Sequence, residues 1–149
     1  MGRALFLLLA ALPFIAAATA PAGGSSTMGV PRTPRINYVL HCQGCHLPDG
    51  SGTEGKVPAL RGHLARFLSV RGGREYIVQV PGVSTSKLND ADTAALMNWL
   101  VREMGPRPPD DFRPYTQSEV AALRARWLNR PGPVRARLQQ TIDRLPSSN

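Results

Sequence analysis

The chain has 149 residues, which is enough for one domain of modest size with short appendages. Its formal net charge is +8 at pH 7, and the excess is concentrated toward the carboxyl end. Between Arg35 and Glu103, eight Lys and Arg accompany six Asp and Glu, whereas residues 105–149 hold eight Arg and four acidic residues. This bias favours an acidic partner protein. No basic run is dense enough to indicate a nucleic-acid-binding protein, and none is expected.

The first segment is typical of a secretory signal peptide. Gly2-Arg3 give a positive start, residues 4–18 are apolar apart from Pro13, and small residues follow. A run of about 15 apolar residues is short of the roughly 20 that span a bilayer, which argues against a transmembrane anchor. We predict a signal peptide over 1–22 and a flexible leader, rich in Gly, Ser, Thr and Pro, over 23–34. The mature chain is then periplasmic or secreted, with no transmembrane anchor.

Short helical patterns and a glycine-rich loop follow the leader. A helix is expected over 36–42, with one apolar side formed by Ile36, Val39 and Leu40. Residues 47–57 predict a loop because Gly, Pro and Asp recur in them. Residues 63–70 predict a second short helix. Residues 76–80 fit a strand by their β-branched side chains and a helix by their surroundings, so both remain open.

The strongest helical pattern covers residues 91–104. We expect Asp90 or Asp92 to cap this helix. Its apolar stripe consists of Ala95, Leu96, Trp99 and Leu100. A Pro-rich linker, 106–114, precedes two further amphipathic helices, of which the first begins at a capping box, Thr116 to Glu119. Their predicted apolar faces consist of Val120, Leu123 and Trp127 in the first and Val134, Leu138, Ile142 and Leu145 in the second. The pattern as a whole predicts an all-α fold.

The two cysteines of the chain lie in one stretch, Cys42-Gln43-Gly44-Cys45-His46. Two residues between cysteines are too few for a disulfide that staples a fold. Two thiols at this spacing lie on one side of a turn, where they can form thioethers with the two vinyl groups of one haem. The next residue, His46, then reaches the iron as its proximal ligand. Because the motif occurs once, we predict one covalently bound haem c.

Two other kinds of site use the same residue types. A redox-active dithiol would favour a βαβ context, which the sequence does not predict. A zinc site would need a fourth ligand, for which His41 or His63 are the candidates. The export signal and the glycine-rich loop favour haem over both.

At this motif the chain resembles the class I-like monohaem cytochromes c. The resemblance covers residues 35–105, about half of the chain. It rests on Tyr38 four residues before the first cysteine, on the Cys42 to His46 motif, on Asp49-Gly50-Ser51-Gly52, on Val57-Pro58-Ala59-Leu60 and on the late helix with Trp99. It implies a cytochrome c domain over 35–105, followed by a Pro-rich linker and basic helical extension over 106–149.

The resemblance also implies roles for two residues after the motif. The carbonyl of Pro58 would accept a hydrogen bond from Nδ1 of His46, and Leu60 would pack on the haem. In this family the distal ligand is usually a Met in the loop before the last helix. Here that loop, 82–89, contains neither Met nor His. The candidates that remain are Met104, Met97, His63, the more remote Met28, or no ligand.

The functional expectation is electron transfer. A periplasmic monohaem cytochrome would carry electrons to or from a partner oxidoreductase that is acidic at its docking surface. Arg61, Arg74 and Tyr76 are candidates for contacts with the haem propionates. The sequence shows no catalytic acid–base pair, so an enzyme is not the first expectation. The alternative is a peroxidase-like haem enzyme or a gas-binding sensor with an open distal site.

Overall fold

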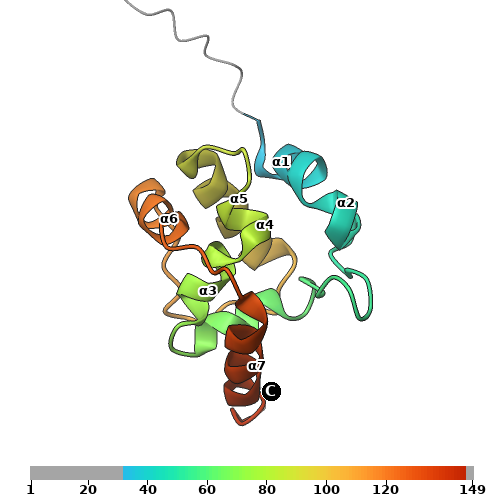
Figure 1. Ribbon diagram of the computed structural model, residues 1–149, viewed down its shortest axis with the longest axis vertical. Coiled ribbons are helices and arrows are strands. Elements are labelled where there is room, and N and C mark those ends of the chain that lie inside the picture. Colours follow the sequence, from blue (N-terminus) through green and yellow to red (C-terminus); the bar gives the residue numbers. More distant parts are fainter. Residues whose placement is uncertain (1–31, 147–149) are drawn as a thin grey trace, which may run out of the picture. The chain divides into compact units, whose positions relative to one another are not determined.

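The computed structural model describes residues 32–146, which form helices and loops (Figure 1). The predicted signal peptide, 1–22, and nearly all of the predicted leader, 23–34, lie outside the described residues. Among the residues that are described, strand-like pairing is limited to one isolated bridge between Thr53 and Val57. The all-α prediction is confirmed. No helix in this part of the chain has the length and apolar character needed to cross a membrane.

Helix α1, Pro34–His41, packs against α5, Asp90–Glu103, through one aromatic residue. Tyr38 is 2% exposed, and its ring centroid lies 5.7 Å from that of Trp99. The prediction of the apolar side is wrong, because the helix buries its Asn37–Tyr38 side instead. The three residues expected on one apolar side are about half exposed: Ile36, Val39 and Leu40.

Helix α3, Gly73–Gln79, settles the ambiguity over residues 76–80 in favour of a helix. It packs against the 3₁₀ helix η1, Leu64–Ser69, and against two later helices, α6, Gln117–Arg124, and α7, Pro131–Ile142. Tyr76, Ile77 and Val78 are therefore all buried. A helix covered on several sides has no polar face, which is why its sequence resembles that of a strand. A single turn, α4, Pro81–Ser84, follows.

The α5 helix begins at Asn89, whose side chain accepts a hydrogen bond from the Asp92 N–H at 2.7 Å. The expectation that Asp90 or Asp92 would be the cap is therefore wrong by one residue or more. The buried stripe is also rotated from the predicted one, since Ala95 is exposed. The buried apolar residues of α5 are Ala94, Leu96, Met97, Leu100 and Val101.

The residues after Gly105 pack onto the same hydrophobic core as those before it. Thr116 caps α6 as predicted by accepting from the Glu119 N–H at 3.2 Å. The Glu119 carboxylate binds Arg74 of α3 through two bonds of 2.7 and 2.8 Å, so this ion pair ties α6 to α3. The predicted apolar faces end early, because Trp127 lies beyond α6 and is 50% exposed, and Leu145 lies beyond α7.

Arg124, at the end of α6, fixes the segment between α4 and α5. Its guanidinium donates to the carbonyls of Ser84, Ser86 and Leu88 at 3.1, 2.6 and 2.8 Å. It also donates to the carboxylate of Asp90 at 2.7 Å. One side chain therefore satisfies most of the free carbonyls of a segment that has no regular structure of its own.

We expect Arg124→Ala to lower the free energy of unfolding by about 2–4 kcal/mol, because several part-buried carbonyls and a carboxylate lose their donor. Chemical denaturation measures this change. Arg126→Ala is the matched control, since Arg126 is exposed and its side chain bonds only to Ala122 of its own turn. The control should change the free energy by less than about 0.5 kcal/mol. Equal effects of the two substitutions would show that Arg124 does not organise this segment.

Candidate functional site

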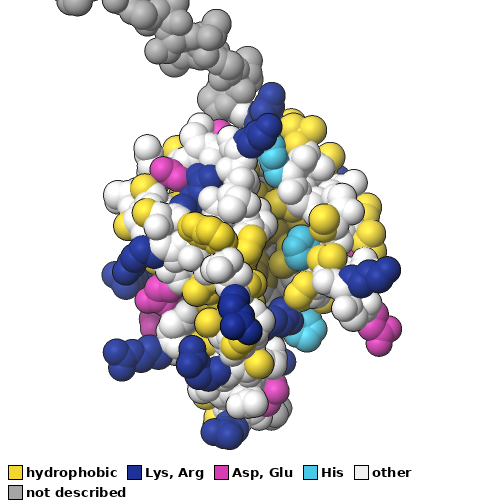
Figure 2. Space-filling view, viewed as in Figure 1, with side chains coloured by type: hydrophobic (Ala, Val, Ile, Leu, Met, Phe, Trp, Pro, Cys, Tyr) yellow, Lys and Arg dark blue, Asp and Glu magenta, His cyan; other side chains and the backbone are white. Residues whose placement is uncertain are grey.

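A cavity of about 310 Å³ lies within the hydrophobic core, and its lining is mostly aliphatic and aromatic. Figure 2 shows hydrophobic side chains gathered around a hollow near the middle of the drawn face, with a histidine beside them. Side chains from α1 and α2, Gln43–His46, form one end of the lining. The rest comes from residues 58–60, η1, α3, α5, the 80–83 segment and the start of α7. The volume is in the range of ligand-binding cavities.

Cys42, Cys45 and His46 sit on one tight turn at this cavity. The Cys42 carbonyl accepts from the N–H groups of Cys45 and His46 at 3.1 and 2.9 Å, which holds the three residues together. Burial and the neighbouring Cys45 raise the pKa of Cys42 to about 11. A redox-active dithiol requires the opposite shift, so this environment does not favour one. No cluster of three or more His, Cys, Asp or Glu suited to holding a metal ion occurs within residues 32–146, so the zinc alternative gains no support.

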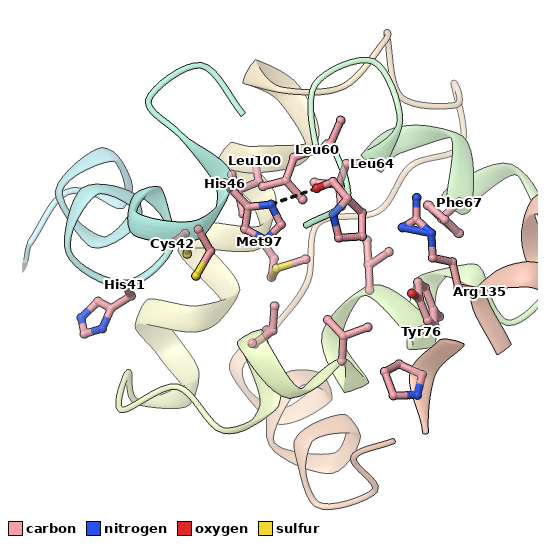
Figure 3. Close-up of a pocket in the computed structure, with 18 residues that line it drawn as sticks. His41, Cys42, His46, Leu60, Leu64, Phe67, Tyr76, Met97, Leu100 and Arg135 are labelled. Carbon is pink, nitrogen blue, oxygen red and sulfur yellow. Dashed lines mark hydrogen bonds between the residues drawn. The ribbon is translucent and has the colours of Figure 1, made fainter. Parts of the chain in front are cut away.

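His46 is oriented by a hydrogen bond to the backbone. Its Nδ1 donates to the carbonyl of Pro58 at 3.1 Å, the contact that the family resemblance implies (Figure 3). This bond leaves Nε2 as the nitrogen available to a ligand. Burial lowers the pKa of His46, while the bond to Pro58 opposes that shift. The imidazole is therefore neutral near pH 7, which is the form that binds a metal.

The loop over 47–60 brings Pro58 to His46 by a backbone path that needs glycine. The Gly52 N–H donates to the His46 carbonyl at 3.1 Å, and the Leu60 N–H donates to the Gly50 carbonyl at 2.8 Å. Gly52 has φ +70°, and a Cβ there would lie 2.4 Å from the Val57 carbonyl oxygen and 2.9 Å from that of Pro58. Only glycine allows the backbone to approach this closely.

The candidates for a distal ligand lie in different places. Met97 is 1% exposed and lines the cavity. Met104 is buried but lies away from the lining, with its Sδ 4.0 Å from a guanidinium nitrogen of Arg61. His63 is exposed and does not line the cavity either. Met28 lies outside the described residues. Gly82 and Val83 are the residues of the 82–89 loop that contribute to the lining.

The candidates for propionate contacts also separate. Tyr76 is buried and lines the cavity. Arg74 is bound to Glu119 and lies 4.0 Å from the centroid of the Tyr115 ring, outside the lining. Arg61 donates to the Asp49 carbonyl instead.

One lining residue, Arg135 of α7, was not among the predicted site residues. Its sequence region reads as a solvated basic tail, which is why the prediction passed over it. Arg135 does lie at helical spacing from Leu138 and Ile142, both buried, and that spacing is the signal that assigns it to the inward face.

Two relatives share this framework. Cytochrome c-552 of Thermus thermophilus is 34% identical to the chain over 106 residues, which covers 58% of this chain and 81% of the relative. A cytochrome c-552 from a named strain of the same organism is also 34% identical over 106 residues, with 72% of that relative covered. No family model matches the chain.

The chain belongs to the monohaem cytochrome c family. It is a c-type cytochrome electron carrier, and its cofactor is covalently bound haem c. The residues of the cavity fit that group, because two thiols and an imidazole stand at one end of an otherwise apolar space. An apolar lining suits the flat macrocycle, and the thiols suit its vinyl groups.

We expect Gly52→Ala to weaken the hold of this cytochrome on its proximal histidine. The added Cβ clashes with the backbone at Val57 and Pro58, so the Pro58 carbonyl must move away from His46. The strained backbone at positive φ and the clash together should cost about 2–4 kcal/mol in thermal unfolding.

Gly55→Ala is a close control for this substitution. Gly55 has nearly the same φ, +69°, but a Cβ there meets no atom within 4 Å. The control should therefore cost about 1 kcal/mol, from backbone strain alone. If both substitutions cost the same, the close approach of Gly52 to Pro58 does not matter for stability.

Proposed function

We propose that this cytochrome carries electrons between partner oxidoreductases of the periplasm through one haem joined to Cys42 and Cys45, with His46 as the proximal iron ligand. The observation that carries the proposal is the bond from His46 to the Pro58 carbonyl, made beside both cysteines at one end of an apolar cavity. A histidine that is oriented, neutral and half-buried is prepared for ligation.

The remaining residues of the cavity have supporting roles in this proposal. When bound, the haem supplies the one-electron chemistry of its iron. Leu60 and the aliphatic residues of α3 and α5 exclude water from the macrocycle, which disfavours the extra charge of the ferric state. The thioether bonds retain the cofactor in a chain that buries a small core.

The partner and the location belong to the same proposal. The charge excess after Gly105 supports docking to an acidic surface on the redox partner. The apolar segment at the start of the chain supports export through a signal peptide, into a compartment where haem is attached to cysteines. We further propose that residues 35–105 form the part that carries the haem, and that residues 106–149 form its cover.

We expect Cys42→Ala and Cys45→Ala each to leave one thioether bond and the double substitution to abolish covalent attachment. The pyridine haemochrome spectrum distinguishes two, one and no thioether bonds. His46→Ala should keep attachment but change the spin state, because the iron loses its proximal ligand. His41→Ala is the control, since His41 lies on the adjacent helical turn, is exposed and has no ligand role in the proposal. Unchanged haemochrome spectra in the cysteine variants would overturn the assignment.

The distal position is the finer question. Of the candidates within the described residues, Met97 alone lines the cavity, so we propose Met97 as the sixth ligand of the electron carrier. A second function, ligand binding at an open iron, is favoured by one observation: Gly82 and Val83, from the loop that carries the ligand in related cytochromes, offer the cavity no ligand.

Spectra of Met97→Leu separate these two functions. If Met97 is the ligand, the ferric wild type has the weak red absorption band of Met-ligated haem, and its ferrous form resists carbon monoxide. Met97→Leu then loses the band and binds carbon monoxide. Met104→Leu, which changes a buried methionine away from the cavity, should do neither. A wild type that lacks the band and binds carbon monoxide supports the open site instead.

A further inference from the structure

Arg135 stands at the end of the cavity farthest from the cysteines. Figure 3 shows Cys42 at one side of the view and Arg135, with Tyr76 and Phe67, at the other, with His46 between them. Arg135 comes from α7, near the end of the described chain, whereas Cys42 comes from its beginning. It is the one Lys or Arg among the lining residues that the structure describes.

The Arg135 guanidinium has no anionic partner in the described part of the chain. The ion pairs found there join Arg66 to Asp143, Arg74 to Glu119 and Arg124 to Asp90. Arg135 lies instead over the ring of Phe67, 5.8 Å from its centroid. A half-buried cation against an aromatic ring at the edge of an apolar space is a ready site for a carboxylate.

Tyr76 supplies a second donor at the same end. It is 7% exposed and lines the cavity, and its hydroxyl makes no hydrogen bond to another described residue. Burial raises the pKa of Tyr76, and the charge of Arg135 opposes that shift, which places the two groups within electrostatic reach of each other. A buried tyrosine hydroxyl usually finds a partner, and here the protein provides none in residues 32–146.

The chemistry of haem says which of its groups reaches this end. The two vinyl groups, which become the thioethers, occupy one edge of the macrocycle, and the two propionates occupy the opposite edge. A haem fixed by Cys42 and Cys45 at one end of the cavity therefore directs its carboxylates toward the other end. That end holds the arginine and the tyrosine hydroxyl.

We propose that Arg135, together with Tyr76, binds a haem propionate and so joins helix α7 to the cofactor. The inference rests on the proposed attachment at Cys42 and Cys45. Arg135 is a positioning residue for the propionate and for α7. The extension after Gly105 is then a wall of the haem site, held partly by the cofactor itself.

The test compares the holoprotein with Arg135→Gln, Arg135→Lys and Tyr76→Phe. Arg137→Gln is the matched control, because Arg137 lies on the same helix, is exposed and does not line the cavity. Two properties are measured: the reduction potential, and the hydrogen exchange of the α7 amides. The pyridine haemochrome spectrum of each variant establishes that both thioethers are present, so that a failure of attachment is not mistaken for a failure of this inference.

We expect Arg135→Gln to lower the reduction potential, because an uncompensated propionate stabilises the ferric state. The same variant should exchange its α7 amides about tenfold faster, since a charged hydrogen bond that holds the helix is lost. Arg135→Lys should restore much of the potential, and Tyr76→Phe should lower it by less. Arg137→Gln should change neither property.

The inference is overturned if Arg135→Gln and Arg137→Gln have the same potential and the same exchange rates while both thioethers are intact. It is also overturned if exchange rises but the potential does not change, because Arg135 would then support α7 without touching the cofactor. In either case the proposed electron-carrier function stands.

Discussion

The fold depends on an apolar cavity in the middle of its core. Hydrophobic side chains surround that space, and side chains beside a void lose the packing contacts and the burial that stabilise a core. The cofactor of a c-type cytochrome is therefore part of the hydrophobic core. The rest of the structure positions the walls: a glycine loop brings Pro58 to His46, and Arg124 fixes the segment between α4 and α5.

The haem motif and the helical periods were accessible from the sequence because they are local. Cys42 to His46 form one turn, and the contact from His46 to Pro58 follows from a short loop whose glycines set its path. The helices at residues 91–104 and after Thr116 were found within a few residues of their ends. Their caps and outer turns were less well predicted, since a neighbouring Asn competes with Asp for the cap of α5.

The errors share a different cause, which is tertiary packing. Helix α1 turns Tyr38 toward Trp99 and leaves Ile36, Val39 and Leu40 half exposed, which no hydrophobic pattern within the helix reveals. Helix α3 is apolar on several sides because other helices cover it. Arg135 reads as solvated from its composition and acquires a role only because α7 folds back onto the cavity. A residue whose surroundings come from distant segments is poorly specified by its own neighbours.

The order of the segments along the chain has a consequence for maturation. The turn with the cysteines lies near the start of the described chain, and the helix that closes the far end of the cavity lies near its finish. Contacts between distant segments form late in folding, because closing a long loop costs more entropy than closing a short one. During folding, the thiols thus meet an open cavity, accessible to haem and to the machinery that joins it. Closure by α7 then completes the site around a cofactor that is already in place.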